Sequence, residues 1–378
     1  MSDSKLRVHE VTRQVELASH LSAWEQLAAE APYGEWFASP HWVLPWLDAF
    51  GHPDRLAIQF VYDGARLVGV VPLVRPTDSR KGCSPTRVFP VNNHVRRVGA
   101  LSVIPMADLL TVVFDQARQT GRFRCWALPQ IPVEGEFDQA LRAAIRRSRV
   151  LEFSVEETRG AVVEFHGGWD AYTRTLNPKL VQKLQQKQRK LERAGGWTFR
   201  TITESSAWAD GWSDVLSIEA RSWKHATGTS IVNEPGTATL YEGVGTRCVS
   251  AGLLRLHLVA HEGIPVAHAM GVVSRGTYFL LKNSYAEEYK SSSAGMVLVW
   301  HAMAEAASSG CQRFDFLGDA MEWKMELATS SPAYRSSTIF PSSNVLCLLG
   351  RVKEQTLKPL ARRLGLKRLL RPLLRVGG

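Results

Sequence analysis

Residues 276–318 decide the fold and read GTYFLLKNSYAEEYKSSSAGMVLVWHAMAEAASSGCQRFDFLG. Residues 277–282 form a short β-branched and aromatic run, which is long enough for a buried strand. Residues 291–293 are serines that can cap a helix, and apolar residues follow at helical spacing until Gly310. Residues 313–317 predict a second strand. The stretch therefore predicts a strand, a turn, a capped helix and another strand.

The predicted start of that helix has a further property. A helix start rich in Ser and Gly leaves free N–H groups pointing at one spot, with the positive end of the helix dipole behind them. Such a turn can bind an anion, including a pyrophosphate. The alternative interpretation is an ordinary βαβ crossover with a well-capped helix.

Two segments about 200 residues apart follow the same scheme. Residues 55–74 contain two β-rich runs around Asp63-Gly64, and residues 255–273 repeat this pattern around Glu262-Gly263. The turn chemistry of each predicts a β-hairpin. The segments are either unrelated hairpins or the two copies of an internal duplication.

Other patterns outline the rest of the chain. The residue spacing predicts helices over 11–30, from Ser39-Pro40 onward, and over 137–149. Residues 151–156 and 161–165 predict strands. Residues 177–194 predict a helix that carries six basic residues and one acid, Glu192. That helix presents either a solvated charged face or a contact for the phosphates of a nucleotide-linked substrate, a tRNA or coenzyme A.

Composition limits the class of protein. A chain of 378 residues with 45% hydrophobic residues predicts two globular domains. No apolar stretch approaches the roughly 20 residues of a membrane-spanning helix, and the charged start MSDSKLRVHEV is not a signal peptide. Five scattered cysteines favour reduced thiols, so we expect a cytoplasmic protein. The pair His257 and His261 has no carboxylate between its members and lies in a predicted strand, so we expect no metal.

The charge is concentrated at the C-terminus. The net charge of the chain is +10, and residues 351–378 contain nine basic residues and one acid. Leucines alternate with these cations, a pattern typical of a helix on an anionic bilayer surface. A helix packed on the protein itself and a nucleic-acid arm are the alternatives.

Several of these residues together resemble a known family. The chain is similar to the Gcn5-related N-acyltransferase (GNAT) superfamily in its two-domain Fem-like branch, and within it to CelD-type acetyltransferases found beside cellulose and exopolysaccharide genes. The resemblance covers most of residues 20–340. The residues that carry it are Tyr285, Tyr289, the turn Ser292-Ser293-Ala294-Gly295, the strand 314–318 (FDFLG), Trp323-Lys324 and the run 219–224 (EARSWK).

The resemblance implies a fold and its divisions. It implies an α/β protein with mixed sheets, built as a tandem duplication of two GNAT-like halves. Residues 1–160 would form the acceptor half, residues 161–345 the acyl-donor half, and residues 346–378 a basic amphipathic tail. A monomer or weak homodimer is expected.

The resemblance also implies a site. In GNAT proteins the thioester lies between two strands that splay apart, here 277–282 and 313–317, with the pyrophosphate on the following turn. Lys290, Ser292, Ser293, Ala294 and Gly295 would bind the donor, although the turn has only one of the usual glycines. The expected catalytic residues are Lys324, Tyr289, Glu219, Asp315 and His268. The expected substrate-binding residues are Trp223, Lys224, Tyr285, Asp319 and Trp323.

The residue types alone do not decide which side chain acts as the general base. Glu219, His225, His268, Asp315 and Asp319 are all candidates, because each can accept a proton near neutral pH or when its environment is perturbed. A carboxylate such as Glu219 can equally form an ion pair on its helix, and His268 can be a satisfied core histidine.

The predicted function is acyl transfer, with acetyl-CoA as donor and an amine or hydroxyl of a sugar, an exopolysaccharide precursor or a small metabolite as acceptor. One alternative is an aminoacyl-tRNA-dependent transferase of the Fem type, which the basic helix at 177–194 favours. A second alternative is a non-catalytic GNAT-like scaffold at a membrane synthase.

The tail generates a first testable prediction. We expect the full chain to co-sediment with anionic vesicles at low salt, because each cation near such a surface contributes about 1 kcal/mol. Binding should weaken steeply as salt rises, since screening acts within about 8 Å at physiological ionic strength. Removal of residues 351–378 should abolish co-sedimentation. If the full chain ignores anionic vesicles at low salt, the tail is structural and its removal should lower the melting temperature.

Overall fold

The computed structural model describes residues 6–51, 55–76, 87–92, 95, 97–120, 125–234 and 236–341. The predicted tail, residues 346–378, lies outside this part of the chain. We refer to the elements up to β8 as the first half and to those from β9 to α12 as the second half. None of the helices in the described residues is long and apolar enough to cross a membrane.

The first half contains two small sheets with helices packed on them. One sheet has the strand order β1-β3-β4-β6-β2, and its neighbouring strands are all antiparallel. The elements of this half are β1 (Arg7–Val11), α1 (Gln14–Leu17), η1 (Ala18–His20), α2 (Leu21–Glu30), β2 (Tyr33–Gly34), η2 (Trp36–Ala38), α3 (Pro40–Phe50), β3 (Ile58–Asp63), β4 (Arg66–Val71), β5 (Arg87–Val88), β6 (Leu101–Ser102), α4 (Met106–Gln119), β7 (Trp126–Pro132), α5 (Glu136–Ser148) and β8 (Val150–Arg159).

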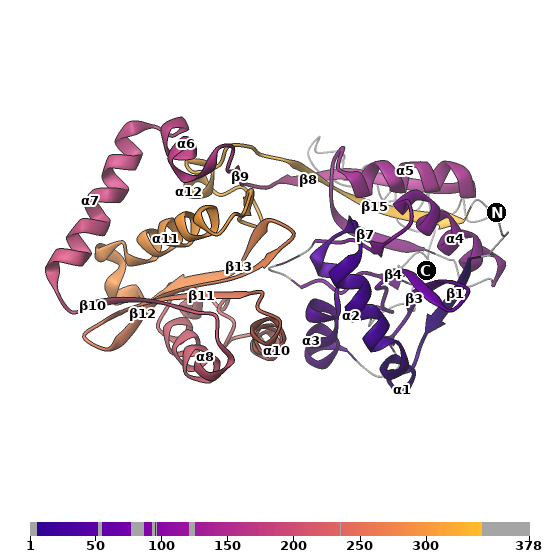
Figure 1. Ribbon diagram of the computed structural model, residues 1–378, viewed down its shortest axis with the longest axis horizontal. Coiled ribbons are helices and arrows are strands. Elements are labelled where there is room, and N and C mark those ends of the chain that lie inside the picture. The colour runs from indigo at the N-terminus through magenta and orange to yellow at the C-terminus, as the bar shows by residue number, and fades with distance from the viewer. Residues whose placement is uncertain are drawn as a thin grey trace, which may run out of the picture.

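The second half is built on one mixed sheet with the order β10-β11-β12-β13-β14-β9. Its elements are β9 (Val162–Glu164), α6 (Gly168–Thr175), α7 (Pro178–Ala194), β10 (Trp197–Ile202), α8 (Ser205–Ala220), α9 (Trp223–Ala226), α10 (Thr237–Ser250), β11 (Leu254–His261), β12 (Ile264–Ser274), β13 (Thr277–Tyr285), η4 (Glu287–Ser292), α11 (Ala294–Ser308), β14 (Arg313–Asp315) and α12 (Glu322–Met325). Helix α11 covers one face of this sheet, and α8 and α10 cover the other (Figure 1).

The two halves are joined by strands as well as by side chains. The last described strand, β15 (Ala333–Pro341), returns to the first half and pairs with β7 and β8. Figure 1 shows β8 and β15 running side by side from one half to the other. One hydrophobic cluster also spans both halves, because Trp24, Trp42 and Trp46 of the first half share it with Trp208 and Tyr241 of the second.

Most of the expected elements are present. Both hairpins are confirmed, with Asp63 opposite Arg66 and His261 opposite Ile264 at their ends. The basic helix is confirmed as α7, and the side chain of Asn177 accepts a hydrogen bond from the Lys179 N–H at its start. The mixed α/β fold with two tandem halves is therefore the fold that the sequence predicted.

The prediction of one helix over residues 11–30 was wrong at its start. Val11 belongs to strand β1, where it pairs with Ile58 at the edge of the sheet. The helical part begins at Gln14 and is divided into α1, the 3-10 helix η1 and α2. Pairing with a neighbouring strand overrode the local helical pattern at Val11, because strand pairing depends on residues distant in sequence.

A buried ion pair connects the halves at the level of β14. Arg97 of the first half donates hydrogen bonds to Asp315 Oδ2 and to the Tyr334 hydroxyl of β15, both at 2.8 Å. The Arg97 and Asp315 side chains are only 6% and 3% exposed. The guanidinium also lies 4.5 Å from the centre of the Tyr334 ring. A single first-half side chain thus binds β14 and β15 together.

This ion pair gives a stability prediction. Arg97→Met should lower the free energy of unfolding by about 3–5 kcal/mol, because it leaves the Asp315 carboxylate buried without its cation. The double variant Arg97→Met/Asp315→Asn should recover much of that loss. As a control, Arg147→Met removes the exposed pair with Asp108 and should change stability by less than about 1 kcal/mol. Denaturant unfolding measures all three, and equal effects of the two single variants would contradict the prediction.

Candidate functional site

The candidate site begins where two parallel strands part. Strands β13 and β14 are paired only from Thr277 opposite Arg313 to Phe279 opposite Asp315. Beyond this point β13 continues along β12 as far as Tyr285. The chain after β14 turns away, because Leu317 has a left-handed backbone (φ 51°) and its N–H donates to Asp315 Oδ1 at 2.9 Å. The two strands therefore diverge.

A cavity of about 760 Å³ occupies the opening between them. It is bounded by the end of β13, the start of α11, residues 316–324, and side chains from α7 and α9. The first half contributes Gln130 to the wall. The sequence-predicted residues that line it are Trp223, Lys224, Tyr285, Tyr289, Lys290, Ser293, Ala294, Gly295, Asp319, Trp323 and Lys324.

The turn before α11 forms one wall of the cavity. Ser293 has a left-handed backbone (φ 61°), and α11 starts at the next residue. The Ser292 hydroxyl is used within the turn, since it donates to the Tyr289 carbonyl and accepts from the Ala294 N–H. At Gly295 a Cβ atom would lie 3.1 Å from the Tyr285 ring, so any side chain there would press on the aromatic wall.

The basic helix α7 reaches this same turn. The Lys187 ammonium donates a hydrogen bond of 2.8 Å to the Ser293 hydroxyl. Burial and the neighbouring Lys183 lower the pKa of Lys187 below its ordinary value. Lys290, which we expected to be the cation of the turn, is exposed and paired with Glu287 at 3.0 Å. Lys187 was not among the predicted site residues, and its contact depends on packing between distant helices.

The opposite part of the cavity contains three largely buried lysines. Lys324 donates to the Leu317 carbonyl at 2.7 Å and to the Asp319 carbonyl at 3.3 Å. Burial lowers its pKa to about 8, although Asp315 and Asp319 act in the opposite direction. Burial likewise lowers the pKa of Lys282 to about 8, against the effect of Glu219, and lowers that of Lys224. The cavity is therefore strongly cationic.

Sequence reasoning missed Lys282 as a site residue. It ends the apolar run YFLLK on β13, and its side chain is only 6% exposed. The register between β12 and β13 shifts beside it, so that Met270 lies opposite Lys282 and Gly271 opposite Leu280. A lysine at the end of a buried strand was the available signal, because a buried lysine is rare unless it is paired or functional.

Glu219 and His268 form a buried pair that does not line the cavity. The Glu219 carboxylate is 3.0 Å from His268 Nε2 and accepts from the Ser230 hydroxyl at 2.7 Å. Burial alone would raise the pKa of Glu219, but the hydrogen bond with His268 and the charges of Lys282 and Lys224 lower it. Burial lowers the pKa of His268. We therefore take Glu219 as ionised and His268 as neutral, with Nε2–H donating to the carboxylate.

The other base candidates are placed separately. Asp315 is bound to Arg97 and lines a smaller cavity of about 300 Å³ between the halves. His225 lies 3.1 Å from the Asn233 side chain in an exposed position. Asp319 is exposed and accepts from the Thr158 hydroxyl at 2.8 Å. Of the carboxylates in the described residues, Asp319 is the one that lines the large cavity.

Comparison with known proteins finds a similarity for this part of the chain. Residues 178–325 match the family model of the acetyltransferase (GNAT) domain. The match includes α7, both parted strands, the turn before α11 and Lys324. Over these residues the second half is therefore similar to a GNAT acetyltransferase domain. No curated protein sequence matches the chain.

Solved structures of similar fold extend over both halves. The structure of FemX has a TM-score of 0.60 at 11% identity and covers 91% of this chain and 99% of that one. A conserved protein of unknown function from Bacteroides thetaiotaomicron has a TM-score of 0.59 at 9% identity, covering 88% and 100%. The C-terminal domain of a protein described as a lysylphosphatidylglycerol synthetase from Agrobacterium fabrum has 0.53 at 12% identity, covering 89% and 97%. At these identities the likeness shows the fold.

The buried lysine gives a pH prediction. The pKa of Lys324 is about 8 in the folded chain, against an ordinary 10.5. Between these values the unfolded chain binds a proton that the folded chain does not, so the free energy of unfolding rises with pH. From pH 8 to 10.5 wild type should gain up to about 3 kcal/mol relative to Lys324→Met.

Denaturant unfolding across this pH range measures the difference. Lys190→Met, which removes an exposed lysine of α7, is the control and should give a flat difference from wild type. A flat difference for Lys324→Met as well would show that its amine does not lose its proton in this range.

Proposed function

We propose that this protein transfers an acyl group from an acyl-CoA thioester, acetyl-CoA first among them, to an amine or hydroxyl acceptor. The observation that carries the proposal is the parting of β13 and β14 after three residue pairs, with a cavity in the opening. The turn before α11 lies on one side of the opening, and the buried lysines lie on the other.

The pyrophosphate of the donor would lie on the turn before α11. Of the first N–H groups of α11, that of Ala294 donates to the Ser292 hydroxyl and that of Met296 to the Ser293 carbonyl. This leaves the Gly295 N–H at a helix start where the helix dipole favours negative charge. Lys187 is already in contact with Ser293 and supplies a full positive charge at the same place. The positive charge of Lys187 offsets the lack of the N–H groups that a longer glycine-rich turn would offer to the pyrophosphate.

The reacting carbonyl would lie near Lys324. The acceptor nitrogen or oxygen attacks the thioester carbon, and the C–S bond breaks. The sulfur leaves as the CoA thiolate, which takes up a proton from solvent. Negative charge develops on the carbonyl oxygen during the attack, and a preorganised cation in a buried site stabilises that charge. Lys324 is held by two backbone carbonyls for this purpose. Asp319 would bind the acceptor amine and receive its proton.

Glu219 and His268 act in this proposal as positioning residues. Their pair lies behind Lys282 and Lys224, and the Glu219 charge is the buried negative charge that offsets both lysines. Asp315 likewise holds the backbone turn at Leu317, whose carbonyl binds Lys324. None of the three touches the acyl group directly.

The acceptor would enter beside Trp223, Trp323 and Asp319, with Gln130 from the first half on the facing wall. We propose a sugar or exopolysaccharide precursor, on the resemblance to CelD-type acetyltransferases. Transfer would take place in the cytoplasm, at the inner face of the membrane if the tail binds lipid. A comparison of metabolites between wild-type and deletion strains would test the acceptor class.

Calorimetry with a panel of CoA derivatives tests the donor. Lys187→Met should weaken binding about tenfold, because it removes a charge-assisted hydrogen bond. Lys190→Met removes the same charge from an exposed position of the same helix and should change the affinity less than about twofold. Equal losses in both variants would mean that only the overall charge of α7 matters. No response of wild type to any CoA derivative would exclude the CoA donor.

One observation favours a second donor. Helix α7 presents exposed cations, including Lys179, Lys183 and Arg189, beside the turn that Lys187 contacts. An aminoacyl-tRNA would match this extended basic surface better than a single nucleotide would. RNase treatment of an active lysate separates the two donors, since CoA-dependent transfer survives the treatment and tRNA-dependent transfer does not.

A further inference from the structure

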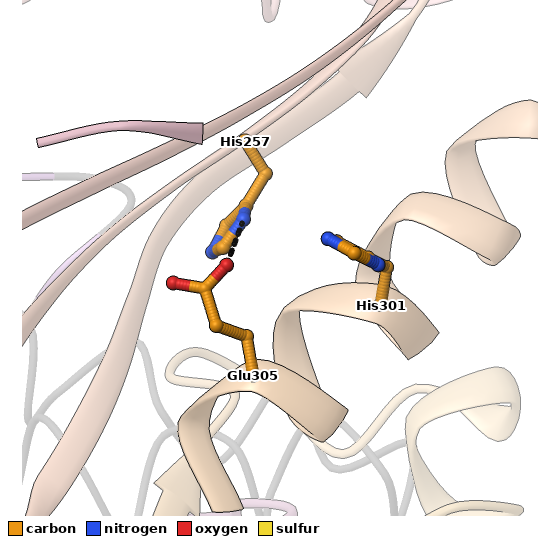
Figure 2. Close-up of side chains that lie close together, drawn as sticks. All are labelled: His257, His301 and Glu305. Atoms are coloured by element: carbon orange, nitrogen blue, oxygen red, sulfur yellow. Dashed lines mark ion pairs between the residues drawn. The ribbon is translucent and has the colours of Figure 1, made fainter. Parts of the chain in front are cut away.

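A second cluster of chemically active side chains lies between the sheet and α11, separate from the acyl cavity. His257 belongs to β11, and His301 and Glu305 lie one turn apart on α11. Figure 2 shows both rings and the carboxylate turned toward one another. One potential ligand atom from each residue lies within 4.8 Å of the other two. His257 is fully buried, while His301 and Glu305 are half-buried at the rim.

The cluster contains buried polar atoms without partners. His257 Nε2 has no hydrogen-bond partner among the described residues, and neither has the hydroxyl of Tyr278, whose ring stacks on His257 at 6.0 Å. The Thr201 hydroxyl is already used, since it donates to Glu305 Oε2 at 3.0 Å. Leaving a buried polar atom unpaired costs about 1–3 kcal/mol. His257 Nδ1 lies 3.1 Å from the Thr201 hydroxyl and 3.5 Å from Glu305 Oε2, so Nε2 is the unpaired nitrogen of the ring.

We propose that His257, His301 and Glu305 bind one divalent transition metal ion of the zinc class. Two imidazoles and a carboxylate are a donor set suited to such ions. Zinc bonds of about 2.0–2.2 Å require the three donors to move closer than they now stand. The side chains of His301 and Glu305 can make that movement, because both are only half-buried on α11. A water molecule would complete the coordination.

The site was not visible as a sequence pattern. The pair His257 and His261 led us to expect no metal, and four residues along a strand do separate two side chains by about 13 Å. The structure instead combines His257 with a histidine and a glutamate at i, i+4 spacing on a helix more than forty residues later. One charge opposes a metal here: Arg255 Nε lies 3.9 Å from Glu305 Oε1.

The experiment uses the full chain without a histidine tag, stripped of metal by a chelator and with its thiols alkylated. Zn²⁺ is added alone, and calorimetry and retained metal after gel filtration are measured. We expect one Zn²⁺ per chain and a higher melting temperature. His301→Ala and Glu305→Gln should each weaken binding by more than about tenfold. His166→Ala, which removes an exposed histidine elsewhere, should leave it unchanged.

A further variant is expected to strengthen Zn²⁺ binding instead of weakening it. Arg255→Gln should tighten Zn²⁺ binding, because it removes the positive charge beside Glu305. Absence of binding at micromolar Zn²⁺ would overturn the proposal, and the orphaned atoms would then be partners of a water molecule. Binding that persists unchanged in both His301→Ala and Glu305→Gln would place the metal elsewhere on the chain and would also overturn it. These readouts do not depend on acyl transfer.

Discussion

The structure depends on one buried carboxylate, that of Asp315, at the residue where β14 leaves β13. A carboxylate in a strand centre is costly to bury, and two partners satisfy it: the guanidinium of Arg97 and the N–H of Leu317. The second bond holds Leu317 in a left-handed conformation and turns the chain away from β13. That turn opens the cavity and points the Leu317 carbonyl at Lys324. Asp315 thus fixes the backbone that positions Lys324, although Asp315 itself does not line the large cavity.

The cationic character of the cavity follows from burial in the same region. Lys224, Lys282 and Lys324 lie close to few buried negative charges. The carboxylate of Glu219 is the negative charge that acts on both Lys224 and Lys282. Lysines in such surroundings lose part of their stabilisation by water, which is why their pKa values fall. A bound anion would restore the balance. The positive charge of the cavity therefore favours a negatively charged ligand.

The first half completes the site without repeating its chemistry. It supplies Arg97 to the ion pair and Gln130 to the cavity wall. Strand β15 returns from the second half into a sheet of the first, and one hydrophobic cluster contains residues of both halves. Movement of one half against the other would break the buried pair of Arg97 and Asp315 and divide the hydrophobic cluster that spans both halves. The geometry of the cavity is consequently fixed by both halves together.

Local sequence determined the elements of this protein and the turn that marks its site. The hairpins at Asp63-Gly64 and Glu262-Gly263, the capped helix α7 and the strand 277–282 depend on neighbouring residues, and all are present. Nine of the eleven predicted site residues that line the cavity lie within residues 285–324, while Trp223 and Lys224 come from α9. Only the tertiary structure decided the partners of Asp315, Glu219 and Lys187. Those partners are Arg97, His268 and Ser293, at sequence separations of 218, 49 and 106. No local pattern records such pairs, because burial and packing between distant elements create them.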